Sequence, residues 1–169
     1  MDTALLLIDV QRNMLQPPEP VPAAAAVSAS IGRLLDRVRS AGALVVHVRN
    51  NGAEGDPDAP GTRGWELVHE VRAGEWVVDK NEPDSFAGTP LADLVPASSR
   101  LVVAGMQSEY CVRETALGAL RRGHRVTLAR GAHATYDDGQ PAAVVAGQVE
   151  EELAGAGAAV VDADDVTFD

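Results

Sequence analysis

The sequence predicts an α/β fold with three layers, in which a six-stranded, mostly parallel, Rossmann-like sheet carries helices on both faces. Six short apolar runs rich in valine and leucine recur along the chain, and nearly continuous runs of this kind are typical of strands buried on both faces. Helical patterns lie between several of them, and this alternation favours a parallel sheet. We expect the strands at residues 4–10, 43–49, 76–80, 100–105, 125–129 and 158–162.

Three segments between these runs have the apolar spacing of helices. One follows Gly105, where we expect Ser108 to cap the helix and Gly123 to mark its end. Another covers residues 141–154 and has a proline in its first turn. The first helix precedes Gly42, and one apolar stripe joins Val27, Ile31, Leu34, Leu35 and Val38.

The composition limits the classes of function. A chain of 169 residues fits a single domain, residues 1–169. With 25 acidic and 14 basic residues, its formal charge of -11 argues against nucleic-acid and anionic-membrane partners. No apolar run is long enough for a membrane-spanning helix. Cys111 is the only cysteine and cannot form an internal disulfide, so we expect a reducing, cytoplasmic location.

Residues 50–64 form a long loop that is rich in glycine, proline and aspartate and has no periodicity. A loop of this length within one domain is usually functional or disordered. We interpret it as a flap beside the active site.

Three chemically active side chains follow three different predicted strands. Asp9 ends the first strand, Lys80 ends the third, and Cys111 lies in the first helical turn after the fourth. In an open α/β sheet, ligands bind outside the carboxyl ends of the strands. The sequence therefore predicts an acid, a base and a thiol at one edge of the sheet.

This combination is typical of nucleophilic catalysis. The helix N-terminus and the charge of Lys80 are expected to lower the pKa of Cys111. Asp9 could take the thiol proton and return it to a leaving amine. Backbone N–H groups around residues 107–111 could stabilise a developing oxyanion.

Other interpretations of these residues remain open. Cys111 could simply pack in the core, Asp9 could be a turn residue, and Lys80 could be a solvated surface charge. A redox-sensing or binding domain with a reactive cysteine and no turnover is the alternative function, although such sensors usually have a resolving cysteine. Nucleotide binding requires a glycine-rich turn after the first strand, and "DVQRNMLQPP" contains no glycine.

The motifs resemble those of the isochorismatase-like cysteine hydrolases. The family has Asp-x-Gln after the first strand, seen here in "LLLIDVQRNML". A lysine ending a middle strand is followed by a Ser-Phe pair in "VVDKNEPDSFAGTPLADLV". The third motif, Gly-x-x-Ser-x-x-Cys-Val with a later Thr-Ala, stands as "GMQSEYCVRETAL". The order and spacing match from Asp9 to about Tyr136.

The resemblance implies a catalytic triad of Asp9, Lys80 and Cys111. It also implies a cis peptide between Met106 and Gln107, which would turn the N–H groups of Gln107 and Cys111 into an oxyanion hole. Members usually form homodimers or higher homo-oligomers, and a neighbouring subunit sometimes contributes to the pocket. No cofactor is expected, and the partner is a small-molecule substrate.

The same resemblance favours one reaction over another. Members that cleave the vinyl ether of isochorismate lack the cysteine, whereas this chain has Cys111. We therefore predict a hydrolase of amides or related C–N bonds other than peptide bonds, acting through a thioester.

Two departures from the family pattern stand out. Nicotinamidases of the family bind zinc through Asp-x-His and a second histidine, but the corresponding strand end here reads "VVHVRNNG". His47 and His69 alone make a weak ligand set, so no metal is predicted. The second departure is Gly131, which stands where the family usually has an aspartate, and Asp137 or Asp138 could replace that carboxylate.

Four side chains are the predicted substrate-binding residues. Tyr110 precedes the cysteine, Trp65 follows the loop of residues 50–64, and Phe86 follows the lysine strand. Aromatic side chains shape small sites by excluding water, although Trp65 and Phe86 could equally be core residues. Gln11 could also act indirectly, by orienting the backbone or Asp9.

Overall fold

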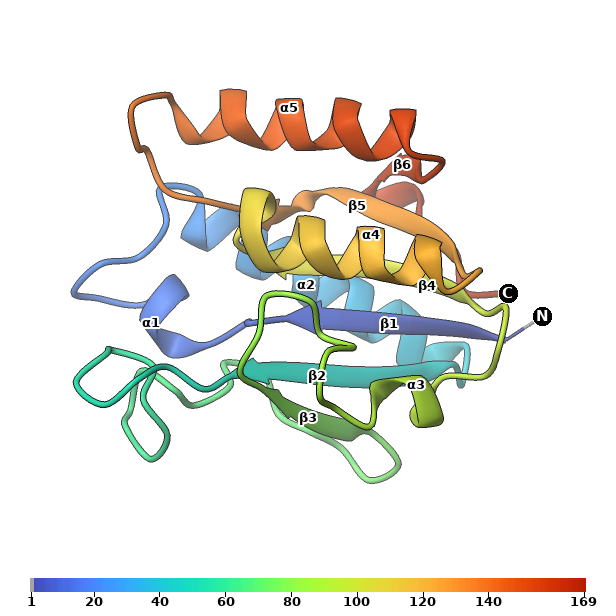
Figure 1. The fold of residues 1–169 in the computed structure, drawn as a ribbon, viewed down its shortest axis with the longest axis horizontal. Coiled ribbons are helices and arrows are strands. Elements are labelled where there is room, and N and C mark those ends of the chain that lie inside the picture. Colours follow the sequence, from blue (N-terminus) through green and yellow to red (C-terminus); the bar gives the residue numbers. More distant parts are fainter. Residues whose placement is uncertain (1) are drawn as a thin grey trace.

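A six-stranded sheet forms the centre of the computed structural model, which describes residues 2–169 (Figure 1). The strands lie in the order β3-β2-β1-β4-β5-β6, and every neighbouring pair is parallel. The predicted α/β fold is confirmed, and each predicted strand is present. Their bounds are β1 (Thr3–Ile8), β2 (Leu44–Asn50), β3 (Trp76–Lys80), β4 (Arg100–Met106), β5 (Arg125–Ala134) and β6 (Ala159–Asp162).

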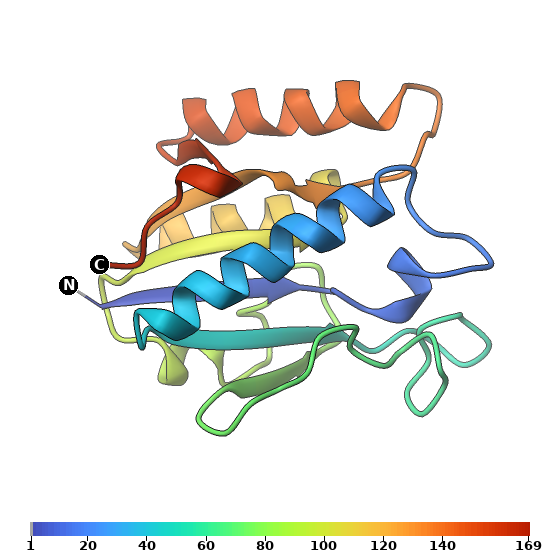
Figure 2. The same cartoon turned by 180° about the vertical axis from the view of Figure 1, so that it is seen from behind.

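The central strand β1 explains why the apolar runs are continuous. All six of its residues are buried, because helices cover both faces of the sheet. Leu6 and Ile8 belong to the core beneath α4 (Arg113–Arg121) and α5 (Ala142–Gly155). Leu5 and Leu7 belong to the core beneath α2 (Ala24–Ser40). Figure 1 shows α4 in front of the sheet, and Figure 2 shows α2 crossing the opposite face.

The predicted apolar stripe of the first helix is the buried face of α2. Gly42 follows with a φ of 66°, a left-handed conformation that glycine adopts without a steric penalty. Two short helices, α1 (Arg12–Leu15) and α3 (Leu91–Leu94), and the 3-10 helix η2 (Ala163–Asp165) were not predicted. Elements of three or four residues are too short to show a period.

The helix after β4 begins differently from the prediction. Its first turn is a π-helix, η1 (Ser108–Val112), and α4 continues from it. Ser108 does not cap the helix: Gln107 is the N-cap residue, and the Ser108 hydroxyl lies 2.7 Å from Nδ1 of His133. The prediction of a Ser108 cap is therefore wrong, because the hydroxyl binds a side chain from β5 instead of an N–H group of the helix. The helix ends at Arg121, and Gly123 follows with a φ of 83°.

Strand β5 continues to Ala134, five residues beyond its predicted end at residue 129. Its pairing with β4 contains a bulge, since Val103 pairs with Leu128 but Gly105 pairs with His133. Gly131 lies within this bulge with a φ of 83°. The left-handed backbone favours glycine over aspartate at this position.

The carboxyl ends of the strands gather on one edge of the sheet, together with α1 and the loop that follows β2 (Figure 1). Gln11 in this region forms an antiparallel bridge with Leu67, which holds the far end of that loop against the chain after β1. Within residues 2–169, no helix is both long and apolar enough to cross a membrane.

Gly105 is a point where β4 packs on β1 with no room for a side chain. A Cβ atom there would lie 2.0 Å from the carbonyl oxygen of Ile8, and the φ of Gly105 is 122°. We expect Gly105→Ala to lower the free energy of unfolding in urea by about 3 kcal/mol or more, through overpacking and backbone strain.

Gly32→Ala is the matched control, because Gly32 lies inside α2 and a Cβ there would meet nothing within 4 Å. It should raise the free energy of unfolding by about 0.5–1 kcal/mol, the difference in helix propensity. Equal effects of the two substitutions would contradict the close approach of Gly105 to β1.

Candidate active site

The structure brings Asp9, Lys80 and Cys111 into contact at the carboxyl edge of the sheet. Nζ of Lys80 lies 3.3 Å from Oδ2 of Asp9 and 3.3 Å from Sγ of Cys111. The Lys80 side chain is fully buried, and Asp9 is 2% exposed. Lys80 is thus not a solvated surface charge, and Asp9 is not an exposed turn residue.

The local fold explains how residues from distant strands meet. Asp9 follows β1 in a left-handed conformation with a φ of 50°, which aspartate tolerates better than most residues. Its N–H group donates to the carbonyl of Val48 at 2.9 Å, so its backbone is fixed against β2. Lys80 ends β3 directly beside Asn50 of β2, and its long side chain reaches past β2 to the end of β1.

Cys111 lies in η1, and two contacts hold this turn, one from His133 of β5 and one from Thr135 directly after β5. Ser108 binds His133, whose Nε2 lies 3.0 Å from Oε1 of Glu150 on α5. The Thr135 hydroxyl donates to Oε1 of Glu109 at 2.5 Å. The extension of β5 beyond its bulge therefore fixes the segment that carries the thiol.

The electrostatics of the site correct one expectation from the sequence. Burial, and then the neighbouring Asp9 carboxylate, raise the pKa of Cys111 to about 12, although Lys80 opposes this shift. Burial also raises the pKa of Asp9 to about 6, against the attraction of Lys80 and a hydrogen bond from Cys111. Loss of solvent thus outweighs the effects expected to lower the thiol pKa. The resting pair holds its proton on Cys111, with the Asp9 carboxylate as the acceptor.

The backbone before the cysteine has a cis peptide bond between Met106 and Gln107, the position that the family resemblance implies. Met106 is fully buried in the core beneath α2. The carbonyl of Gln107 accepts hydrogen bonds from the N–H groups of Tyr110 and Val112, both at 3.2 Å.

A cavity of about 570 Å³ adjoins the segment that carries the thiol. Tyr110 lines it and is 55% exposed, so this predicted pocket residue lies where a ligand could contact it. The full lining is formed by Gln107, Glu109, Tyr110, Thr135, Tyr136, Asp137, Asp138 and Val145.

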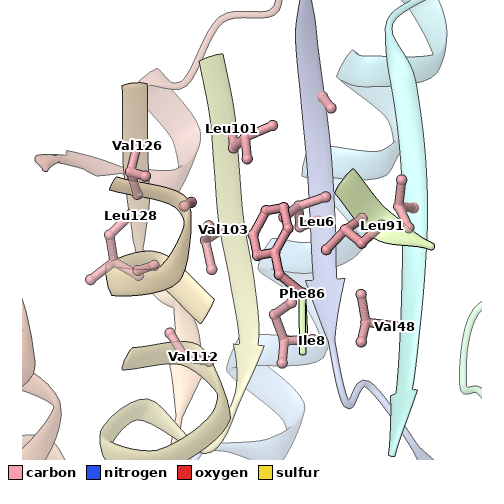
Figure 3. Packing of buried hydrophobic residues seen from close by; sticks show 14 of the residues in the cluster. Leu6, Ile8, Val48, Phe86, Leu91, Leu101, Val103, Val112, Val126 and Leu128 are labelled. Atoms are coloured by element: carbon pink, nitrogen blue, oxygen red, sulfur yellow. The ribbon is translucent and has the colours of Figure 1, made fainter. Parts of the chain in front are cut away.

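The other three predicted substrate-binding residues lie elsewhere. Phe86 is 5% exposed and packs against Leu6, Ile8 and Leu91 in the hydrophobic core (Figure 3). Its aromatic side chain is thus part of the core packing, and contact of Phe86 with a substrate stays a prediction. Gln11 is also buried, and its side-chain amide is occupied by backbone groups of Asn50 and of the loop.

Trp65 anchors the loop after β2. Its Nε1 donates to Oδ1 of Asn51 at 2.9 Å, and the guanidinium of Arg49 lies 3.5 Å from the ring centroid. Nε2 of Gln11 donates to the Trp65 carbonyl at 3.0 Å. One ring face is therefore covered by Arg49, and the residue ties the loop to the end of β2.

Asn50 is a site residue that the sequence reasoning missed. Its Oδ1 accepts a hydrogen bond from Nζ of Lys80 at 2.9 Å, the shortest contact that the ammonium makes. The signal was available, because Asn50 ends the strand between those of Asp9 and Lys80. An asparagine is neither an acid, a base nor a nucleophile, so the residue types that predicted the triad do not single it out.

The surroundings of His47 and His69 lower the pKa of both histidines. His47 is buried and binds Oε2 of Glu75 at 2.9 Å through Nε2, and burial lowers its pKa. Burial likewise lowers the pKa of His69. Residues 2–169 hold no group of three or more histidine, cysteine, aspartate or glutamate side chains placed to bind a metal ion.

Comparison with known proteins assigns the chain to a family. A family model described as the isochorismatase domain matches residues 3–165. The chain belongs to the isochorismatase family. Two streptothricin hydrolases from Streptomyces noursei are each 51% identical to it over 138 residues, which are 79% of this chain but 55% and 50% of those proteins. The chain thus spans about half the length of these curated relatives.

Solved structures of the family share the fold. An isochorismatase from Pseudomonas putida KT2440 is 28% identical, with a TM-score of 0.87 over 97% of this chain and 89% of that one. The pyrazinamidase of Pyrococcus horikoshii, solved in complex with zinc, is 26% identical, with a TM-score of 0.82 over 96% of this chain and 99% of that one.

The contact of Lys80 with the thiol has a consequence for reactivity. Because the positive charge of Lys80 lowers the pKa of Cys111, we expect Lys80→Met to slow alkylation of the thiol by iodoacetamide at pH 8 by about tenfold or more. Cys111 is the only cysteine, so mass spectrometry of the intact protein reads this one site.

Arg121→Met is the control, since it removes a surface cation at the far end of α4. It should leave the alkylation rate unchanged. An equal rate in Lys80→Met and the wild-type protein would show that the ammonium does not act on the thiol.

Proposed function

We propose that the protein is a cysteine hydrolase that cleaves an amide or related C–N bond of a small molecule through a thioester. The observation that carries the proposal is the contact of one buried ammonium, Lys80, with both the Asp9 carboxylate and the Cys111 thiol. Burial of a charge is costly unless it is paired, so a site of this kind persists only when its partners are in place. Family membership and the similarity to a streptothricin hydrolase and a pyrazinamidase support the same reaction class.

The first half of the reaction starts from the resting thiol. Asp9 accepts the Cys111 proton as Sγ attacks the carbonyl carbon of the substrate. The carbonyl electrons move to oxygen, and the N–H groups of Gln107 and Cys111 are the proposed donors to that oxyanion. Collapse of the intermediate breaks the C–N bond, the proton on Asp9 passes to the leaving nitrogen, and a thioester on Cys111 remains.

The second half uses water as the nucleophile. Asp9 is again a carboxylate. It accepts a proton from water as the water oxygen attacks the thioester carbon. When the C–S bond breaks, the thiolate takes the proton from Asp9, and a carboxylic acid is released. The Lys80 ammonium stabilises the negative charge both when that charge is on Asp9 and when it is on Cys111.

This assignment agrees better with the electrostatics than the redox-sensing alternative. Oxidant sensors need a thiolate at neutral pH in an accessible position. Here the pKa of the thiol is raised to about 12, and the base that can deprotonate it is built in beside it. A thiol that loses its proton to Asp9 only as it attacks a substrate is suited to catalytic turnover.

The relatives indicate the first substrates to assay. Streptothricin comes first, because the hydrolases bearing that name are 51% identical over 138 residues, and pyrazinamide comes second. The test is hydrolysis of these compounds, with the thioester trapped by rapid acid quench and detected as a mass increase on Cys111. Loss of both turnover and adduct in Cys111→Ser would support the proposal, and turnover retained in that variant would overturn it.

The pH dependence provides a separate check. Asp9 acts only when ionised, and burial raises its pKa to about 6. We therefore expect kcat/KM to fall as the pH drops through about 6, with one proton controlling the acid limb. Asp9→Asn should abolish turnover, whereas Asp93→Asn, at an exposed position of α3, should leave the profile unchanged. An acid limb near the ordinary aspartate pKa of about 4 would contradict the burial of the base.

A further inference from the structure

A carboxylate of the loop after β2 reaches the catalytic lysine through Asn50. Oδ2 of Asp58 accepts a hydrogen bond from Nδ2 of Asn50 at 2.8 Å. Oδ1 of the same amide accepts from Nζ of Lys80 at 2.9 Å. The result is a continuous chain of hydrogen bonds from the loop to the group that contacts Asp9 and Cys111.

The chemistry of the two ends fixes which way the amide points. An ammonium can only donate hydrogen bonds, and a carboxylate can only accept them. Asn50 satisfies both only when its oxygen faces Lys80 and its nitrogen faces Asp58. If the amide turned over, its NH₂ group would face the ammonium and its oxygen would face the carboxylate.

Gln11 fixes the backbone of Asn50, so only the direction of the side-chain amide remains to be set by other groups. Oε1 of Gln11 accepts from the Asn50 N–H at 2.9 Å, and Nε2 of Gln11 donates to the Asn50 carbonyl at 3.0 Å. These bonds set the position of the residue but not the direction of its amide. Lys80 and Asp58, which contact the two ends of the amide, are the groups that set that direction.

The loop itself is shaped to bring Asp58 to this place. The N–H of Gly52 donates to the Asp58 carbonyl at 2.9 Å. A Cβ atom on Gly52 would lie 2.1 Å from Oδ1 of Asp58, so the carboxylate packs over a residue without a side chain. Asp56, two residues earlier, has a different contact and accepts from the N–H of Ala53 at 3.0 Å.

We propose that Asp58 is a positioning residue of the active site: it orients the Asn50 amide so that its oxygen fixes the Lys80 ammonium between Asp9 and Cys111. All three N–H bonds of the ammonium then have an acceptor, at 2.9 Å in Asn50 and 3.3 Å in each of Asp9 and Cys111. The loop after β2 is thereby coupled to the nucleophile, since displacing Asp58 frees the amide to turn. The inference rests on the proposed function only for its activity readout.

A charge-exchange cycle tests this inference. Asp58→Asn replaces a group that can only accept by an amide that can also donate, so the Asn50 amide is no longer held in one direction, and Asn50→Asp places two carboxylates against each other. Each variant should lower kcat by about tenfold and slow alkylation of Cys111 by a similar factor, with KM little changed. Asp56→Asn, in the same loop, should match the wild-type protein.

The double variant Asn50→Asp with Asp58→Asn separates positioning from a merely structural effect. In it, a carboxylate oxygen again faces Lys80 and an amide nitrogen again faces the carboxylate. We expect kcat and the alkylation rate to recover by about threefold or more from the Asn50→Asp values, but not to the wild-type values, because the carboxylate next to Lys80 weakens its attraction for the thiolate. Failure of this rescue in a variant that melts like the wild-type protein would overturn the inference. If one single variant does not fold, the double variant is compared with the other single variant, and the same outcomes apply.

The two readouts distinguish the two claims. If no amide is hydrolysed but alkylation follows the cycle, the proposed function fails and the role of Asp58 stands. If amides are hydrolysed and Asp58→Asn behaves like Asp56→Asn in both assays, the role of Asp58 fails and the proposed function stands.

Discussion

The buried ammonium of Lys80 is the constraint on which the rest of the site depends. A charged group without solvent is tolerated only when acceptors surround it, because the cost of dehydration otherwise exceeds what packing contributes. Its three acceptors come from Asp9 after β1, Asn50 at the end of β2 and Cys111 in η1. The register of the first three strands and the position of the helix after β4 are therefore coupled through one nitrogen atom.

Much of the fold could be predicted because its signals are local and repeated. Each apolar run that predicted a strand forms one, and the apolar stripe of α2 is buried as its spacing requires. The extension of β5 escaped prediction because it depends on a bulge against β4, and pairing between distant strands leaves no periodic trace. The role of Ser108 escaped for the same reason, since its partner His133 lies 25 residues away.

The candidate site was predictable in residue type but not in its electrostatics. The order of strand ends along the chain brought Asp9, Lys80 and Cys111 together, as the topology of a parallel sheet implies. Lys80 is the only lysine of the chain, whose other lysine or arginine residues are all arginines, and this also singles it out as a candidate site residue. The pKa of Cys111 could not be obtained in this way, since a sequence shows which charges exist but not how much water remains near them. The buried environment and the Asp9 carboxylate raise that pKa, although Lys80 acts in the opposite direction.

These opposing effects determine how the proposed chemistry must work. In this site the ammonium is compensated by a single negative charge, which resides on Asp9 at rest and moves to Cys111 when the thiol is deprotonated. The net charge of the three groups is the same before and after this transfer, so no new charge has to be buried when the nucleophile forms. The main requirement is that Lys80 stays equally close to both groups, at 3.3 Å from each. A neutral acceptor such as the Asn50 amide suits this requirement better than a second carboxylate in its place. An additional negative charge next to Lys80 would weaken its attraction for the thiolate, whereas Asp58 acts from one residue further away and leaves that attraction in place.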